Sequence, residues 1–345
     1  MTSLARAPRL ALAALLLPGL LPLAAPALAG APDAGAAAAG ESTAGGTAYV
    51  SNERGDSVTV IDLASGTVTA TWPVGKRPRG IALTRDGTRV LVATGQDNAV
   101  EVRDRASGRL IATLPSGQDP EQFFPARDGR LLFVANEDDA AVTAIDLAAR
   151  QVAWQVPVGR EPEGIAESPD GRWLVVTSED QHALAWIDLA TRQPVAETAT
   201  AARPRHVEFT PDGGELWVAA EAGGVVQVVS PASRAVIAMI AFAPPGVPAY
   251  KVLPCGIRFT PDGARALVAL GRANHVALVD VASRKVLAYI PVGARPWHLA
   301  LTPDARRALV ANGMSDDVSV IDLAAGRVTA TIRAGAGPWG VAIAP

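Results

Sequence analysis

The chain has 345 residues, of which 49% are hydrophobic and 19% charged, and its formal net charge is −3. A small negative charge without a basic cluster argues against a protein that binds nucleic acid. Cys255 is the only cysteine, so the chain cannot form an internal disulfide.

The first residues have the pattern of an export signal. Arg6 and Arg9 precede an apolar run rich in leucine and alanine, and small residues stand at Ala27 and Ala29. These features are typical of a secretory signal peptide. We therefore predict a signal peptide at residues 1–29, a periplasmic location and no membrane span after cleavage. The alternative is an uncleaved membrane anchor.

The next segment, residues 30–46, is rich in alanine, glycine and small polar residues. This composition supplies too few large apolar side chains to build a core, so it predicts a flexible leader.

From residue 47 to the end, the sequence repeats with a period of 42 residues. One landmark is the aspartate that ends the third strand of a repeat, at Asp62, Asp104, Asp146, Asp188, Asp280 and Asp322, with Ser230 in the equivalent place. A second landmark in the same phase is a proline, at Pro78, Pro120, Pro162, Pro204, Pro254, Pro296 and Pro338. A period of about 40–45 residues is the length of a β-propeller blade.

The repeat at residues 293–332 predicts four short strands, at 298–302, 308–312, 318–322 and 328–332. Each is a run of valine, isoleucine, leucine or threonine between turn-forming residues. The first repeat has only three such strands, at 49–52, 58–62 and 68–72, and its missing strand is found at 340–344. We therefore predict an all-β, seven-bladed propeller over residues 47–345, closed by the C-terminal strand.

One step of the repeat is 50 residues long instead of 42. The extra residues lie between Ser230 and Pro254 and place residues 242–251 in the link between the fifth and sixth blades. Because loops on a rigid scaffold often carry function, we expect this loop, with Tyr250 and Lys251, to belong to the working surface.

The first strand of a blade is the innermost, so the residues after the prolines should surround the mouth of the central channel. In ring order they are Trp339, Arg79, Glu121, Glu163, Arg205, Cys255 and Trp297, and the next position adds Gln122, His206 and His298. Adjacent tryptophans facing charged groups suit a planar anionic ligand. In the alternative interpretation, Arg79 pairs with Glu121 and Arg205 pairs with Glu163, while the tryptophans pack under loops.

Two other sites can be considered from the sequence. His206, Cys255 and His298 come from neighbouring blades and could bind a metal, but they have no short spacing signature, so we expect no metal. A set of glutamates at the ends of second strands could bind a cation or a basic partner, although we expect a solvated rim; they are Glu53, Glu137, Glu179 and Glu221.

Short motifs suggest a family. The runs YVSN at 49–52, VID at 60–62 and PRG at 78–80 resemble the YVTN family of β-propeller repeats. The runs ELWVAAE at 215–221, RPW at 295–297, NGMSDDVSVID at 312–322 and PWG at 338–340 are similar to propeller proteins associated with PQQ-dependent catabolism. This resemblance implies a periplasmic setting beside quinone-dependent alcohol dehydrogenases, cytochromes c and transport components.

We therefore expect a non-catalytic binding or scaffold propeller whose channel mouth takes a small anionic ligand or a partner protein. PQQ or another quinone is the expected ligand, and the expected partner is a periplasmic quinoprotein dehydrogenase, a cytochrome c or a transport component. Two alternatives remain: a lactonase-like hydrolase that uses His206, His298 or Glu163, and a purely structural interaction module.

Overall fold

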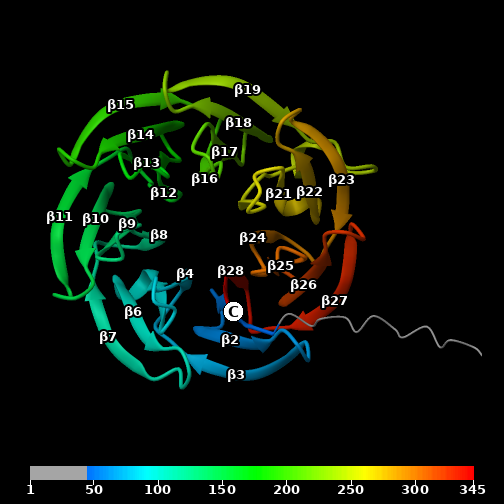
Figure 1. Cartoon of the computed structure of the whole chain (residues 1–345), viewed down its shortest axis with the longest axis horizontal. Helices are drawn as coiled ribbons and strands as arrows, with labels where there is room; N and C mark the ends of the chain where they lie inside the picture. Colours follow the sequence, from blue (N-terminus) through cyan, green and yellow to red (C-terminus); the bar gives the residue numbers. More distant parts are fainter. Residues whose placement is uncertain (1–44) are drawn as a thin grey trace, which may run out of the picture. The chain divides into compact units, whose positions relative to one another are not determined.

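The computed structural model describes residues 45–345 and confirms the predicted seven-bladed β-propeller (Figure 1). Each blade is a four-stranded antiparallel sheet. The predicted signal peptide (1–29) and nearly all of the predicted leader (30–46) lie outside the described residues. Within the described range, no helix has both the length and the hydropathy needed to cross a bilayer.

The four strands of a blade succeed one another from the channel outward. Blade one contains β28 (Pro338–Ala344), β1 (Thr47–Asn52), β2 (Ser57–Asp62) and β3 (Thr67–Pro73). Blade two contains β4 (Pro78–Leu83), β5 (Arg89–Thr94), β6 (Ala99–Asp104) and β7 (Leu110–Pro115). Blade three contains β8 (Pro120–Pro125), β9 (Leu131–Asn136), β10 (Ala141–Asp146) and β11 (Gln151–Pro157). Blade four contains β12 (Ile165–Glu167), β13 (Trp173–Ser178), β14 (Ala183–Asp188) and β15 (Gln193–Ala199).

The remaining blades follow the same order. Blade five contains β16 (Pro204–Phe209), β17 (Leu216–Ala220), β18 (Val225–Ser230) and β19 (Ala235–Ala241). Blade six contains β20 (Ile257–Phe259), β21 (Arg265–Ala269), β22 (His275–Asp280) and β23 (Lys285–Pro291). Blade seven contains β24 (Pro296–Leu301), β25 (Arg307–Asn312), β26 (Asp317–Asp322) and β27 (Arg327–Arg333). Three short helical turns are η1 (Gly95–Asp97), η2 (Ala249–Lys251) and η3 (Gly271–Ala273).

The second and third strands of each blade are nearly continuous apolar runs because both faces of each sheet are covered by neighbouring blades. In β9 and β10, for example, almost every residue is buried. The outermost strands are mostly exposed but bury one inward residue each, at Trp72, Leu114, Val156, Thr198, Ile240, Ile290 and Ile332. A β-bulge in each third-to-fourth pairing adds to the twist of the blade.

The apolar core is a set of layers between neighbouring blades. Trp217 of blade five, for instance, is fully buried against Phe259 of blade six, with ring centroids 5.0 Å apart and an edge-to-face geometry. Its indole Nε1 donates a hydrogen bond to Glu215 at 2.9 Å. Each blade therefore depends on both neighbours, and the ring is stable only when complete.

Closure of the ring occurs as predicted. Strand β28 pairs antiparallel with β1, with Ala344 opposite Thr47 and Val341 opposite Val50. Ser51 of β1 then links two inner strands, because its Oγ accepts a hydrogen bond from the Gly340 N–H at 3.0 Å and donates to the Arg79 carbonyl at 2.6 Å.

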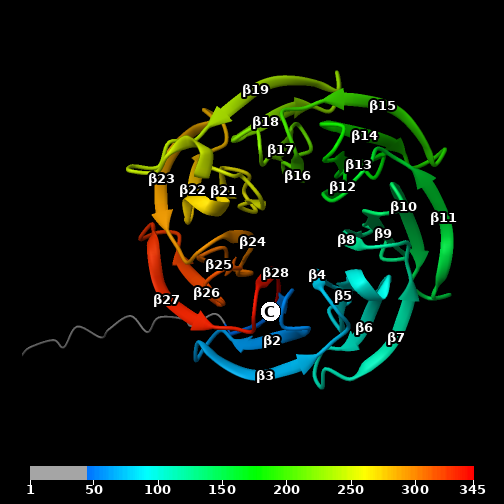
Figure 2. The same ribbon diagram turned by 180° about the vertical axis from the view of Figure 1, so that it is seen from behind.

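The antiparallel order gives the propeller two different faces. We call the face with the links between blades and the turns between second and third strands the link face. The opposite face, with the remaining turns, is the turn face. Inner strands run from the link face to the turn face, and Figures 1 and 2 show them gathered around the channel.

Removing residues 338–345 should prevent stable folding, because it uncovers the edge of β1 and removes the inner strand of blade one. We expect the truncated protein to lose its cooperative thermal transition or to melt tens of degrees lower, as measured by circular dichroism. A chain lacking only Pro345, which is exposed and lies outside β28, is the control. Equal melting of the truncated and intact chains would show that closure does not stabilise the ring.

Candidate functional site

The predicted mouth residues do surround the channel near the link face, but they fill it. Glu121 and Glu163 are completely or almost completely buried, and Cys255 and Trp339 are buried as well. We call the ring of residues that follow the prolines, together with its ion-pair partners, the plug.

One half of the plug joins blades one to three. The guanidinium of Arg79 pairs with Glu53 at 2.8 Å and with Glu121. Arg77 pairs with the same Glu121 at 2.6 Å and with Asp119. The sequence did not single out Arg77 or Asp119, because they lie in the link before the proline.

The other half joins blades four and five. Arg205 pairs with Glu163 at 2.8 Å, with Glu179 at 3.1 Å and with Glu221 at 2.6 Å. Arg203 adds a contact with Glu179 at 2.6 Å. The pairs Arg79–Glu121 and Arg205–Glu163, which the sequence allowed as an alternative, are therefore present.

The expectation of a solvated glutamate rim is wrong. Glu179 and Glu221 are buried, and Glu53 and Glu137 are only partly exposed. All four point toward the arginines of the plug, because the inner ends of the second strands lie beside the mouth ring.

Both predicted tryptophans of the mouth lie next to each other, with ring centroids 6.5 Å apart. Arginines lie over their rings: Arg295 is 3.8 Å and Arg205 5.3 Å from the Trp297 centroid, and Arg79 is 5.8 Å from that of Trp339. Such cation–π contacts occupy the faces that a planar ligand would need at the mouth.

Cys255 takes no part in a metal site with the histidines. Its thiol donates to the Leu253 carbonyl at 3.2 Å, and burial raises its pKa to about 12, so it stays protonated. In the part of the chain that the structure describes, the cluster with three metal-ligand groups within reach of one another is Asp119, Glu121 and Glu137. There the Arg77 guanidinium already supplies the positive charge.

On the turn-face side of the plug the channel opens into a chamber of 370 Å³, lined by the inner strands of all seven blades. We call it the chamber. Its volume lies within the range of small-molecule sites, about 300–1,000 Å³. Its lining includes the aromatic residues Phe123, Phe124, Phe209 and Trp339. It also includes polar and charged residues, which are Gln122, Arg127, Glu167, His206, Glu208, Arg258 and His298. Gln122, His206 and His298, expected at the mouth, line this chamber instead.

His206 is held by its neighbours in the chamber. Its Nδ1 lies 3.1 Å from the Gln122 Oε1 and its Nε2 lies 3.3 Å from the Glu208 carboxylate. Glu208 also pairs with Arg258 at 2.9 Å, and Gln122 donates to the Arg205 carbonyl at 3.2 Å. The polar side of the chamber is thus anchored to the plug.

His298 has no such support. The residue is 8% exposed. Its ring lies tilted against Trp339, with centroids 4.2 Å apart, and edge-to-face with His206, with centroids 5.3 Å apart. Burial, together with the nearby His206 and Arg258, lowers its pKa well below the usual range, so the imidazole is neutral. Neither ring nitrogen has a hydrogen-bond partner among residues 45–345.

A glycine makes room for this histidine. A Cβ on Gly256 would lie 2.8 Å from the Trp297 carbonyl oxygen and 2.9 Å from the His298 Nδ1. Any side chain at this position would therefore displace the inner strand of blade seven. Gly256 allows the two inner strands to approach each other, and Cys255 beside it is buried in the same contact.

Glu208 and Arg258 were not predicted from the sequence, although a signal for them exists. Side chains alternate along a strand, so residues two and four positions after each proline face the same way. The fourth position carries Ala82, Phe124, Ala166, Glu208, Arg258, Ala300 and Ala342, in which a charged pair stands out.

Tyr250 and Lys251 belong to neither the plug nor the chamber. Phe242 and Val252 anchor the two ends of their loop in the core between blades five and six, while Tyr250 is 77% exposed. The loop lies on the link face, so it forms an outer surface beside the plug.

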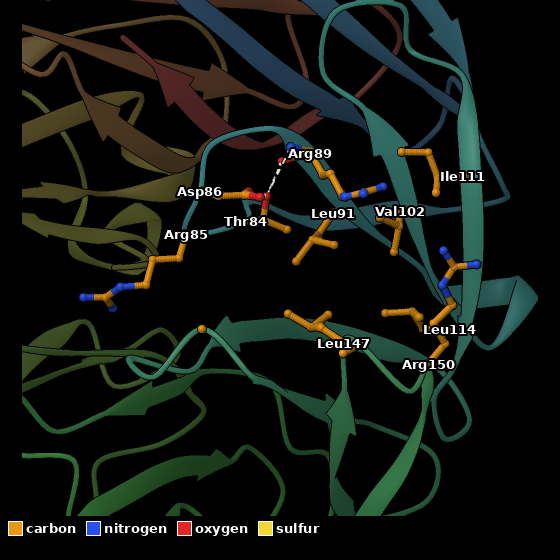
Figure 3. A pocket seen from close by; sticks show the side chains of 12 residues that line it. Thr84, Arg85, Asp86, Arg89, Leu91, Val102, Ile111, Leu114, Leu147 and Arg150 are labelled. Atoms are coloured by element: carbon orange, nitrogen blue, oxygen red, sulfur yellow. Dashed lines mark hydrogen bonds between the residues drawn. The ribbon is translucent and has the colours of Figure 1, made fainter.

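Other hollows lie between blades on the turn face. Figure 3 shows one of 690 Å³, with Leu91, Leu114 and Leu147 at its base and Thr84 bonded to Asp86 at 2.6 Å. Similar hollows lie between blades three and four and between blades five and six. Their repetition indicates a consequence of the blade geometry rather than a specific site.

Burial, together with the excess of carboxyl groups in the plug, raises the pKa of Asp119, Glu137 and Glu163. Burial and the neighbouring Glu121 raise the pKa of Glu137 to about 8. A glutamate in an unfolded chain titrates near pH 4.3. The folded protein therefore binds an extra proton between about pH 4.3 and pH 8, and this group makes it less stable as the pH rises through that window.

Glu137→Gln should remove this dependence, because a neutral amide can donate to Glu121 at every pH. We expect the melting temperature of the variant, relative to the unmodified protein, to be higher at about pH 9 than at about pH 5. Asp138→Asn, an exposed neighbour, is the charge-matched control. A difference that does not change with pH would contradict the assignment.

The fold and the site can be compared with known proteins. The sequence profile described as "Lactonase, 7-bladed beta-propeller" matches residues 168–344, and that of the cytochrome D1 heme domain matches residues 96–205. A histidine would be the natural haem ligand. The matched residues contain one histidine, His182, whose ring hydrogen-bonds to the Glu179 carbonyl at 2.7 Å and which lines none of the hollows described above. The residues therefore do not fit a haem.

Solved structures of similar fold include the Kuenenia stuttgartiensis hydrazine synthase, with 23% identity, a TM-score of 0.74, and coverage of 81% of this chain and 92% of that one. A putative 6-phosphogluconolactonase from Bacteroides uniformis has 19% identity and a TM-score of 0.72, over 87% of this chain and 99% of that one. Another from Bacteroides fragilis has 17% identity and a TM-score of 0.72, over 88% and 98%.

No curated protein matches this chain. At these identities the structural likeness shows the fold alone. The lactonase profile, however, spans just over half of the sequence, including the blades that supply Glu208, Arg258 and His298. The chain therefore belongs to the family of seven-bladed β-propeller lactonases.

Proposed function

We propose that this protein is a periplasmic, non-catalytic binding protein that holds a small anionic molecule in the chamber. The plug closes the channel toward the link face, so the ligand enters from the turn face. This places the ligand one layer deeper than the mouth position expected from the sequence.

The observation that carries the proposal is the free imidazole of His298. The ring lines the chamber, and its nitrogens form no hydrogen bond with any of residues 45–345. A ligand oxygen that accepts a hydrogen bond from this ring would stabilise the complex by about 0.5–1.5 kcal/mol. The indole Nε1 of Trp339, which lines the same chamber, is also buried without a partner in the described part of the chain.

The surrounding groups suggest the kind of molecule. Phe123 and Phe124 provide an aromatic wall, and the side chain of Arg258 is 40% exposed, so donors remain beyond its contact with Glu208. A carboxylate of the ligand could pair with Arg258 while a ring packs on the aromatic wall. PQQ or another quinone with carboxylates fits these residues and is the first ligand to test.

We place the protein beside quinone-dependent alcohol oxidation, as its resemblance to PQQ-associated propellers implies. A periplasmic quinoprotein dehydrogenase, a cytochrome c or a transport component would then dock on the link face. The exposed Tyr250 and Lys251 support this choice, because an aromatic residue and a cation protrude there beside the plug.

His298→Ala should weaken binding of PQQ to the purified protein by about 2- to 13-fold in isothermal titration calorimetry, the equivalent of about 0.5–1.5 kcal/mol. His275→Ala is the matched control, since His275 lies at the start of β22 and bonds to the Ala273 carbonyl. Equal affinities of the His298 variant and the unmodified protein, or no binding to either, would refute the proposal.

A second function, lactone hydrolysis, is favoured by the family and by the neutral His298, which could accept a proton from an attacking water. Glu163, the other base expected under this alternative, is buried in the plug instead. Hydrolysis of a δ-lactone, followed as acid release at constant pH, should then be lost in His298→Ala and kept in His275→Ala. Absence of turnover by the unmodified protein would leave binding as the function.

A further inference from the structure

The chamber does not end where its polar residues end. A second hollow of 460 Å³ adjoins it toward the turn face and shares Ile81, Ala82, Arg258 and Val341 with it. We call this second hollow the vestibule. The two hollows are therefore adjacent and meet at these four residues.

The vestibule has a different chemistry from the chamber. Its wall consists largely of apolar residues from blades six, seven, one and two, including Leu83, Leu301 and Ile343. All three are only partly buried, so they leave apolar surface facing the hollow. Among its lining residues the one charged side chain is Arg258, which stands at the border with the chamber.

The charged and hydrogen-bonding groups line the chamber, Arg127 and Glu167 included, whereas the vestibule has Arg258 as its charged residue. His206 and His298 lie deepest, next to the plug, and Arg258 with Glu208 follows toward the turn face. The hydrocarbon wall continues beyond them on the opposite side. A ligand that fills both hollows must carry hydrogen-bonding atoms at one end and an apolar segment at the other.

We infer that the ligand of this cavity is an amphipathic carboxylate, with its head group at His298 and Arg258 and a hydrocarbon tail along Leu83, Leu301 and Ile343. This inference rests on the proposed function, since it names the class of molecule held by the same chamber. The oxygens of the head group accept hydrogen bonds from the imidazole and the guanidinium. The tail removes the apolar wall of the vestibule from water.

The length of the hydrocarbon tail should determine the affinity of the ligand. Burial of one methylene stabilises a complex by about 0.8 kcal/mol, which corresponds to an affinity about fourfold higher. The affinity of straight-chain carboxylates should therefore rise about fourfold with each methylene until the vestibule is filled, and then level off. A ligand held only by its head group would show no such dependence.

The experiment measures binding of the n-alkanoates from butanoate to dodecanoate to the mature protein by isothermal titration calorimetry. The unmodified protein should show the stepwise rise. Leu301→Asp should weaken dodecanoate at least tenfold and change butanoate little. Leu110→Asp, at an exposed leucine of the outer strand β7, should change neither. The series on the unmodified protein remains decisive if the Leu301 variant does not fold.

The outcomes separate the two proposals. If butanoate or PQQ binds through His298 but longer chains bind no better, the amphipathic ligand is wrong and the proposed function stands. If the rise with chain length is the same in Leu301→Asp, the tail does not lie in the vestibule and the inference is wrong. If no alkanoate and no PQQ binds, both proposals fail.

Discussion

The rest of this structure depends on the pairing of β28 with β1, because a propeller blade can cover its two faces only when both neighbours are present. Each apolar layer is shared between adjacent blades, as in the contact of Trp217 with Phe259. The chain starts with three strands of blade one and supplies the fourth only after the seventh blade. The order of the sequence thus makes completion of the ring a condition for its stability.

Closing seven blades brings seven inner strands close to one axis, and the plug is the consequence. At the link face the residues after the prolines point into a space too narrow for unpaired charges or free solvent. Burying charged groups is costly unless they are paired and hydrogen-bonded. The pairs formed by Arg79 and Arg205 supply the opposite charge, although Glu163 Oε1 and Arg205 Nη1 have no hydrogen-bond partner among the described residues. The pairs add little net stability. Their effect is to close the channel at the link face, so that it is open at one end only.

Because the channel is open at one end only, the two faces of the propeller can have different roles. The chamber and the vestibule lie toward the turn face and are lined by aromatic, charged and apolar residues. The link face presents the loop with Tyr250 and no access to the chamber. Membership of the lactonase family therefore accounts for the architecture, while the chemistry depends on a few inner-strand residues such as His298 and Arg258.

The sequence by itself determined the fold, since the 42-residue period, the four runs per repeat and the displaced fourth strand follow from local patterns. It also determined which residues lie near the axis and allowed the Arg79–Glu121 and Arg205–Glu163 pairs. Local patterns carry this information because strand alternation and turn chemistry act within one blade.

Only the tertiary structure decided whether the mouth is open, where the ligand-sized cavity lies and which glutamates are buried. These properties depend on distances between blades that are far apart in the sequence. Glu179, expected at a solvated rim, is buried because Arg203 and Arg205 of the next blade reach it. The ring of His298 fits in the chamber because Gly256, in the neighbouring blade, has no side chain that would contact it.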